Sequence, residues 1–581
     1  MLKGNGSIAL YLIGCFIIVL GNLPLFWDGI GIRWDAVDNI WVFLRWYGSA
    51  LHEGFFPDFF PYIFSGYPIG SDIQAGPYNI IYLLIAYAFP NSLLSINFIY
   101  LFTQFLIFTL GFGIGTSYRF SPITKLYLGL SLVASGYVIG HASHMSHLAS
   151  AVGLLACFLG LRLAELNRMR FSFIVTFLGV YYQCTGGYVQ DTLFGAICLS
   201  TYWVFQCYKA SGIKWKLFVP VLGALLGLVL SFPAILHFYN LFSQSTRGDG
   251  LSIESALSGS MPLYSVLNLF HAPWLMNFSE PTLERFHLLT ISGILLASSI
   301  GVIIYSKKDR KFLLPLFLLA IFITLLALGR HDILGIRAEL ANQFYIFRAG
   351  KYPSAEHRGV ALFIFALITA FTLQWIVTKW PRVIFIILLL ISGDFLYLKY
   401  HLSELQYSRA IIKSNSAIPS FKVVFYEQDQ AMIDAPRNCD SLGAVDLGAA
   451  IDYQKNHLAP HSFYWAGYEG LLSKAYIENR AYDRQLICGP SRLKEPSSGR
   501  PIKYKLIEYS PSYIKILITD KNFLLPEKMI WADFDDGYWS LDVNGRHEII
   551  HLSPSGMRGI VAKEGDTIEM RYRGPLSRFW R

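Results

Sequence analysis

The stretch GIRWDAVDNIWVFLRW, residues 31–46, places two acidic residues directly after the first long apolar run of the chain. Asp35 and Asp38 lie three residues apart among aromatic residues, where the chain is expected to leave a bilayer. On a helix, side chains at this spacing share one face. Two partly desolvated carboxylates raise each other's pKa or hold a cation, which suits a general base or a metal site. The alternative is a solvated loop in which an aspartate caps a helix N-terminus.

The apolar run before this stretch is one of many, and together they predict the fold class. Of the 581 residues, 54% are hydrophobic and only 15% are charged, with a mean hydropathy of +0.42. A soluble chain of this length would carry more charge, so we expect a polytopic α-helical membrane protein. About eleven spans are predicted from the apolar runs, at residues 8–26, 94–116, 123–140, 148–165, 172–186, 191–207, 217–236, 287–305, 312–328, 359–378 and 383–400.

The chain has a net charge of +9, and much of the positive charge lies in the short loops on one side of these spans. Such an excess of Lys and Arg marks the cytoplasmic side, so the N-terminus is predicted inside and the C-terminal region outside. No continuous basic patch is found on the soluble part, which argues against a nucleic-acid partner.

The first apolar run lacks a small-residue cleavage site and is expected to be an uncleaved anchor. Three longer segments are then outside the cell membrane, at residues 27–93 (the first outer loop), 237–286 and 329–358.

Composition changes near residue 400, which predicts a membrane domain at residues 1–400 and a soluble extracytoplasmic domain at residues 401–581. The second part contains alternating apolar and polar runs, and Asn544-Gly545 between two of them is a strong hairpin signal. A β-rich, β-sandwich-like domain is therefore expected. Cys439 and Cys488 either form a disulfide there or remain free, because the sequence does not give their separation.

Two further segments carry polar residues on the predicted outer side. Arg348, Lys351 and Arg358 run against the positive-inside trend, and Arg suits bidentate phosphate binding. The alternative is contact with lipid headgroups at the ends of spans.

The sequence HASHMSH, residues 141–147, spreads three histidines around a helix, which favours a polar lining over a zinc site. The short apolar stretch at residues 77–90 is bracketed by prolines and is expected to be interfacial or re-entrant.

Four segments of the chain carry a resemblance to one family. TGGYVQ, residues 185–190, is similar to a Gly-His-Pro-Gln outer turn, with Tyr188 in place of the histidine, and FRAGKYPSAEHRG, residues 347–359, resembles a Phe-Arg-x-Pro-x-Arg element. Residues 538–575 resemble a C-terminal Gly-Trp-x-x-x-Val-Asp-Gly pattern. The first outer loop matches at Asp35, Asn39, Leu51, Gly54, Pro57, Gly66, Pro68, Gln74 and Pro77. In this order, the four resemble the YfhO-like family of bacterial membrane proteins, within the C-type (GT-C) glycosyltransferase superfamily.

The resemblance implies an activity and a role for each matching residue. Such enzymes transfer a sugar from a polyprenyl-phosphate donor to a glycan or lipid acceptor at the outer face of the bacterial cytoplasmic membrane. Asp35 would be the general base, with Asp38 assisting or holding a divalent cation (Mg or Mn) together with Asp35. The leaving phosphate requires positive charge, which the resemblance assigns to Arg348, Lys351 and Arg358. The residues expected to contact substrate are Gln74, His144 and Gln190.

Other functions stay open at this point. A non-catalytic transporter or flippase of lipid-linked glycans would need ionisable residues distributed along the spans. The spans here are nearly free of charge, and polar residues gather on the predicted outer face, which favours chemistry at one interface. An assembly factor with an inactive site would keep the same aspartates, so the sequence does not distinguish it.

Overall fold

The structure is a computed structural model, and the chain in it forms two compact units. The first unit contains Met1–Ala36, Leu93–Phe232 and Gly250–Ala410, and the second contains Val37–Ser92, Pro233–Asp249 and Ile411–Arg581. The structure describes residues 2–27, 30–32, 36, 40–52, 54, 56–59, 67–90, 92–209, 215–245, 248–269, 296, 299–300, 303, 307–350, 352–381, 386, 389, 393, 396–397, 407–409, 493–510, 513–534, 537–554 and 557–574.

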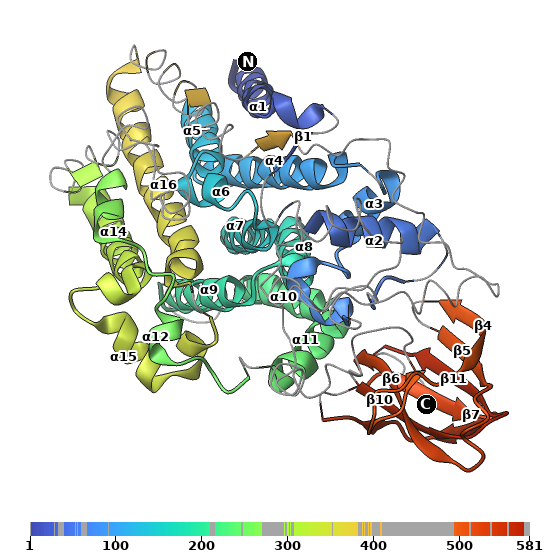
Figure 1. Ribbon diagram of the computed structural model, residues 1–581. Coiled ribbons are helices and arrows are strands. Elements are labelled where there is room, and N and C mark those ends of the chain that lie inside the picture. The colour runs from blue at the N-terminus through green and yellow to red at the C-terminus, as the bar shows by residue number, and fades with distance from the viewer. Residues whose placement is uncertain are drawn as a thin grey trace. The chain divides into compact units, whose positions relative to one another are not determined.

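The first unit is helical (Figure 1). Its longer helices are α1 (Leu2–Gly21), α4 (Leu94–Ser117), α5 (Pro122–Val133), α6 (Gly136–Gly140), α7 (Met145–Glu165), α8 (Met169–Gly186), α9 (Val189–Lys209), α10 (Val219–Leu230), α14 (Lys307–Leu328), α15 (Ile336–Gln343) and α16 (Pro353–Lys379). Short elements between them are η1 (Leu23–Phe26), η5 (Trp215–Phe218), α12 (Ile253–Ala256), η6 (Leu263–Leu269), η9 (Gly329–His331) and η10 (Tyr345–Arg348). Strand β1 (Ile30–Ile32) pairs antiparallel with β2 (Tyr407–Arg409).

Within the described residues, five helical segments are long and apolar enough to cross a membrane. They are Leu94–Ser117, Pro122–Gly140, Met145–Glu165, Leu313–His331 and Pro353–Lys379. The bent pair Trp215–Leu230 and Phe232–Ser243 raises the number to six if it forms one span. The predicted spans at 172–186 and 191–207 are helices α8 and α9, whereas most of the predicted spans at 287–305 and 383–400 lies outside the described residues. A multi-pass helical membrane region is therefore supported, and the count of eleven stays a prediction.

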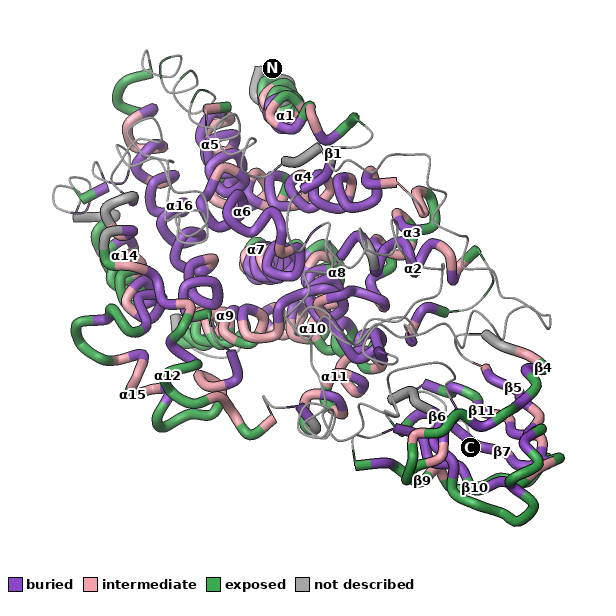
Figure 2. The backbone as a smooth tube through the Cα atoms, viewed as in Figure 1, coloured by how far each residue is buried: buried purple, intermediate pink, exposed green. Residues whose placement is uncertain are grey.

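Local sequence explains where these helices begin and how closely they pack. Ser121 caps α5 by accepting from the amide of Thr124, with Pro122 at the first helical position. Ser135 caps α6 in the same way. On α4, a Cβ added at Gly111 would lie only 3.0 Å from the Cα of Gly129 on α5, so both glycines permit the close approach of these helices. Figure 2 shows α5, α6, α7 and α16 as largely buried helices of this unit.

The second unit combines parts of the first outer loop with the C-terminal region. The loop forms α2 (Trp41–His52), η3 (Ile69–Ser71), η4 (Ile73–Ala75) and α3 (Ile80–Ala88), and helix α11 (Phe232–Gln244) lies in this unit from Pro233 onward. Helix α3 has nine residues, well below the roughly 20 needed to span a bilayer, which agrees with an interfacial segment. Asn79 caps it by accepting from the amides of Ile81 and Tyr82.

The C-terminal region forms two antiparallel sheets, as the sequence predicts. One has the order β3-β6-β10-β9, and the other has the order β4-β5-β11-β7-β8. Asn544 and Gly545 both have positive φ (53° and 76°) in the tight turn between β7 and β8, which confirms the predicted hairpin. The strands are β3 (Leu493–Lys494), β4 (Tyr504–Ser510), β5 (Tyr513–Ile518), β6 (Glu527–Phe534), β7 (Trp539–Val543), β8 (Arg546–Glu548), β9 (His551–Leu552), β10 (Met557–Ala562) and β11 (Thr567–Tyr572).

Both sheets contribute to a single apolar core. Trp531 of the first sheet and Leu541 of the second are fully buried in it, along with Ile516 and Met570. Strands β5 and β11 alternate buried and half-buried side chains over most of their length, which is the pattern of a sheet with one face against a core. Cys439 and Cys488 lie outside the described residues, so their pairing stays open.

Candidate functional site

A cluster of ionisable side chains occupies the N-terminal ends of three helices in the first unit. His147 lies in the first turn of α7, Asp191 in the first turn of α9 and Arg358 in the second turn of α16. Side-chain contacts join these ends to one another and to Tyr137 on α6. Helix N-termini carry a positive partial charge, so their convergence adds to the positive electrostatic potential of Arg358.

Asp191 is the centre of this cluster. One of its carboxylate oxygens accepts from the hydroxyl of Tyr137 at 2.5 Å and from Nδ1 of His147 at 2.8 Å. Its other oxygen, Oδ1, has no hydrogen-bond partner within the described part of the chain. A buried carboxylate oxygen without a partner is costly, which is typical of residues that are kept for function.

Arg358 lies fully buried beside this carboxylate and interacts electrostatically with it. Its Nη2 lies 3.1 Å from Nδ1 of His141, in the turn between α6 and α7. Burial, together with the nearby His147 and Arg358, lowers the pKa of His141 well below its usual value. His141 is therefore neutral at physiological pH. Its Nδ1 donates to the carbonyl oxygen of Tyr137 at 2.9 Å, so its Nε2, 3.4 Å from Nη2 of Arg358, is the atom that can accept a hydrogen bond from the guanidinium.

A second buried ion pair lies next to the cluster. Arg337 on α15 donates to Glu356 on α16 at 3.2 Å and to the carbonyl oxygen of Phe347 at 2.8 Å. The side chains of Arg337 and Glu356 are both buried. Burial lowers the pKa of Arg337, and the Glu356 carboxylate opposes that shift. Asp332 accepts from the amides of Ile336 and Arg337 and so fixes the start of α15.

The segment that carries Arg348 packs against this ion pair. Gln190 donates its side-chain amide to the carbonyl oxygen of Ala349 at 3.1 Å. A Cβ added at Gly350 would collide with Glu356 Oε1 and come within 3.2 Å of Gln190, so only glycine fits there. Arg348 itself is half-buried, and its carbonyl oxygen accepts from the amide of Leu251 at 2.9 Å.

The structure brings part of the predicted site together. His144 and Gln190 lie beside the cluster around Asp191, with Arg358 inside it and Arg348 at the end of η10. Gln74 lies in the second unit, where its backbone amide donates to Asp72. Asp35, Asp38 and Lys351 lie outside the described residues, so their roles stay predictions. Over the part of the chain that is described, no three His, Cys, Asp or Glu residues are grouped to hold a metal ion.

Sequence reasoning missed Tyr137, Asp191 and Glu356. Asp191 directly follows TGGYVQ and is an acidic residue at the start of an apolar run, which is a detectable signal. Glu356 stands inside the quoted 347–359 segment, but its pairing with Arg337 depends on how α15 folds back onto α16. Tyr137 is an aromatic residue among apolar ones, and nothing in the sequence separates it from a core residue.

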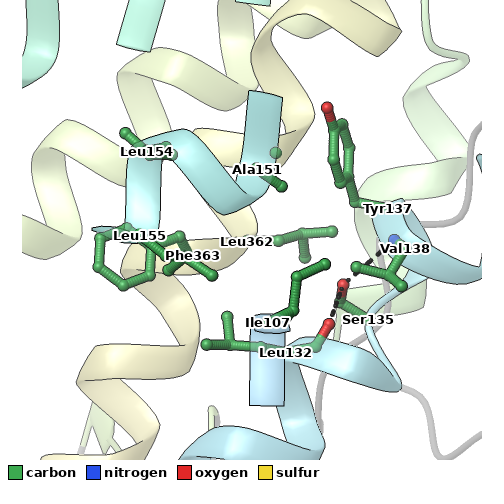
Figure 3. Close-up of a pocket in the computed structure, with 11 residues that line it drawn as sticks. Ile107, Leu132, Ser135, Tyr137, Val138, Ala151, Leu154, Leu155, Leu362 and Phe363 are labelled. Carbon is green, nitrogen blue, oxygen red and sulfur yellow. Dashed lines mark hydrogen bonds between the residues drawn. The ribbon is translucent and has the colours of Figure 1, made fainter. Parts of the chain in front are cut away.

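A small cavity lies next to Tyr137 between α4, α5, α7 and α16 (Figure 3). Its volume is about 20 Å³, and its lining is apolar apart from Ser135 and the tyrosine. The Ser135 hydroxyl donates to the carbonyl oxygen of Leu132, so it is already used within the helix cap. The cavity has room for about one water molecule and none for a sugar.

Similarity to known proteins is found among solved structures. No family model matches the chain, and no curated protein matches it. Among solved structures, the cryo-EM structure of the arabinofuranosyltransferase AftD from mycobacteria is similar, with a TM-score of 0.49 and 11% sequence identity. The match covers 84% of this chain and 33% of that one, so this chain spans about a third of the length of AftD.

Proposed function

We propose that the chain is an integral membrane glycosyltransferase of the C type. It transfers a sugar from a polyprenyl-phosphate donor to an extracytoplasmic acceptor, which is a cell-envelope glycopolymer or a lipid. The observation that carries the proposal is the gathering of Asp191, His147 and Arg358 at the N-terminal ends of three helices. A translocation pathway would instead need ionisable groups along the length of the spans.

The proposed reaction is an inverting displacement. Asp35 takes the proton of the acceptor hydroxyl, the acceptor oxygen attacks the anomeric carbon, and the polyprenyl phosphate leaves with the electrons of the broken bond. Asp38 assists by orienting the acceptor. A divalent cation held by Asp35 and Asp38 stays a prediction on which no step depends.

The leaving phosphate gains charge in the transition state, so it needs fixed positive partners. Arg348 and Lys351 are proposed to meet it, because Arg348 is half-buried and stands on a segment fixed by Gln190 and the Arg337–Glu356 pair. Arg358 is also proposed to hold the phosphate. Its guanidinium is fully buried, so a ligand reaches it only when a covering segment moves.

The experiment is a transfer assay with the purified chain in liposomes. The protein receives a panel of radiolabelled polyprenyl-phosphate sugars and a cell-envelope lipid extract, and both glycosylated product and transbilayer movement of the donor are measured. Arg348→Gln is expected to lower transfer by about 10²-fold or more, because it removes a contact to developing charge. Arg330→Gln is the matched control, since Arg330 is bound to the backbone carbonyls of Leu257 and Ser258.

Two outcomes contradict the proposal. If the donor crosses the bilayer without forming product, the chain is a flippase. If Arg348→Gln and Arg330→Gln transfer equally well, Arg348 does not hold the phosphate.

A further inference from the structure

Phe59 belongs to the first outer loop in the sequence but to the core of the C-terminal β region in the structure. It is only 3% exposed. Its ring meets Trp539 of β7 edge-on with centroids 5.2 Å apart, and Tyr572 of β11 at 5.1 Å. The guanidinium of Arg558 lies 3.5 Å from the Trp539 ring centroid and 5.8 Å from that of Phe59. The loop thus supplies one of the aromatic residues that close the β core.

The backbone around Phe59 is fixed as well. The carbonyl oxygen of Asp58 accepts from the amide of Gly70 at 2.8 Å, which ties residues 56–59 to η3. Gly574, just after β11, has a φ of +64°, and a Cβ there would lie 3.0 Å from Oδ2 of Asp58. Glycine at this position therefore lets the end of β11 approach the loop.

Helix α11 forms a second link between the loop and the β region. The ring of His237 lies 4.7 Å from the ring of Tyr538, and its Nδ1 lies 3.1 Å from the hydroxyl of Tyr78 in the loop. The side-chain amide of Asn240 donates to the hydroxyl of Tyr538. Residues 70–78, α11 and the start of β7 are thus joined through polar and aromatic contacts.

The other end of the first outer loop is also paired with a distant part of the chain. In the first unit, Ile30 and Ile32 of β1 pair with Arg409 and Tyr407 of β2. Asp35 follows β1 by three residues, and β2 directly precedes the C-terminal region in the sequence. The start of the loop, at residues 30–32, is therefore fixed by backbone pairing within the first unit.

We infer that the C-terminal β region positions the first outer loop for catalysis, and that Phe59 is the main positioning residue. This inference rests on the proposed function for the expected contact of Gln74 with substrate, but the physical coupling does not. Removing the Phe59 side chain frees the loop at residues 56–59 and, through the hydrogen bond from Gly70 to Asp58, the turn that carries Gln74. A misplacement of about 1 Å at a reacting group costs about 10²-fold in rate.

The test is hydrogen exchange on the full chain in liposomes, combined with transfer kinetics. Phe59→Ala is expected to speed exchange by about tenfold or more both in the loop, at residues 67–78, and in strands β7 and β11. Its kcat is expected to fall by about 10²-fold with little change in the donor KM. Phe59→Leu keeps most of the apolar volume, so it should restore most of the slow hydrogen exchange and most of the kcat of the wild type. Leu84→Ala is the matched control, because Leu84 is in the same loop and 58% exposed.

Tyr538→Phe is a milder variant for the case in which Phe59→Ala does not fold. It removes only the hydroxyl that accepts from Asn240, and faster exchange in both α11 and the loop is expected. Exchange that rises in the strands but not in the loop, in either variant, overturns the inference. If wild-type protein transfers no sugar while exchange rises in both places, the coupling stands and the proposed function fails.

Discussion

The cluster around Asp191 and the core around Trp539 are both nearly closed to solvent, yet they are built from opposite chemistry. The first gathers carboxylates, guanidinium groups and histidines in the helical unit. The second is formed by aromatic and aliphatic side chains of two sheets, with Phe59 added from the first outer loop. Burying charge costs free energy, whereas burying apolar area supplies it. The cluster is therefore costly to bury, whereas the core stabilises the fold.

The largest effect is expected from breaking the Arg337–Glu356 pair. Arg337→Met leaves the carboxylate of Glu356 buried without its cation, which typically costs about 3–5 kcal/mol of unfolding free energy. The double variant Arg337→Met, Glu356→Gln removes both charges and should recover most of that loss. Thermal unfolding in detergent measures both. Equal melting temperatures for the single and double variants would show that the pair is not electrostatically coupled.

A smaller effect is expected at the glycine that packs against the same pair. Gly350→Ala places a methyl group against Glu356 Oε1 and should cost about 1–3 kcal/mol, with a weaker donor affinity because Arg348 is displaced. Gly195→Ala on α9 is the matched control, since its added Cβ would lie 3.4 Å from Leu154 in ordinary contact. That control should stabilise the helix by up to about 1 kcal/mol. If Gly350→Ala behaves like the control, the 348–350 segment is not held against Glu356.

Much of the fold follows from local pattern. The apolar runs at 94–116 and 148–165 match α4 and α7 closely, and the Asn544-Gly545 turn is where the sequence places it. In contrast, the position of Phe59 could not be predicted, because a phenylalanine in an aromatic-rich loop looks the same whether it meets lipid or a distant sheet. The approach of Asp191 to His147 depends on the packing of α9 against α7, which periodicity does not give.

The smallest effect is expected on the surface of the β region. Lys515 and Arg571 donate to Glu569 at 2.8 and 2.9 Å and hold the pKa of its carboxyl at about 2, below the ordinary 4.5. A lowered pKa adds stability above about pH 4.5, and this is lost as the pH falls towards 2. The groups are partly exposed, so the loss should be about 1 kcal/mol or less. The test measures the free energy of unfolding of wild type and Glu569→Gln between pH 2 and pH 4.5. Parallel pH profiles of the two proteins would show that Glu569 does not contribute to the pH dependence.

Carboxylates of the first outer loop are proposed to act as the base in sugar transfer, and a side-by-side assay of three proteins tests this role. Wild type, Asp35→Asn and Asp38→Asn are compared in liposomes with the donor that gives product, after thermal unfolding has shown that all three fold. Asp35→Asn should abolish transfer while the donor still binds, and Asp38→Asn should retain part of the activity. Normal transfer by Asp35→Asn would remove this residue from the role of base, and normal transfer by both variants would contradict a catalytic role for the first outer loop.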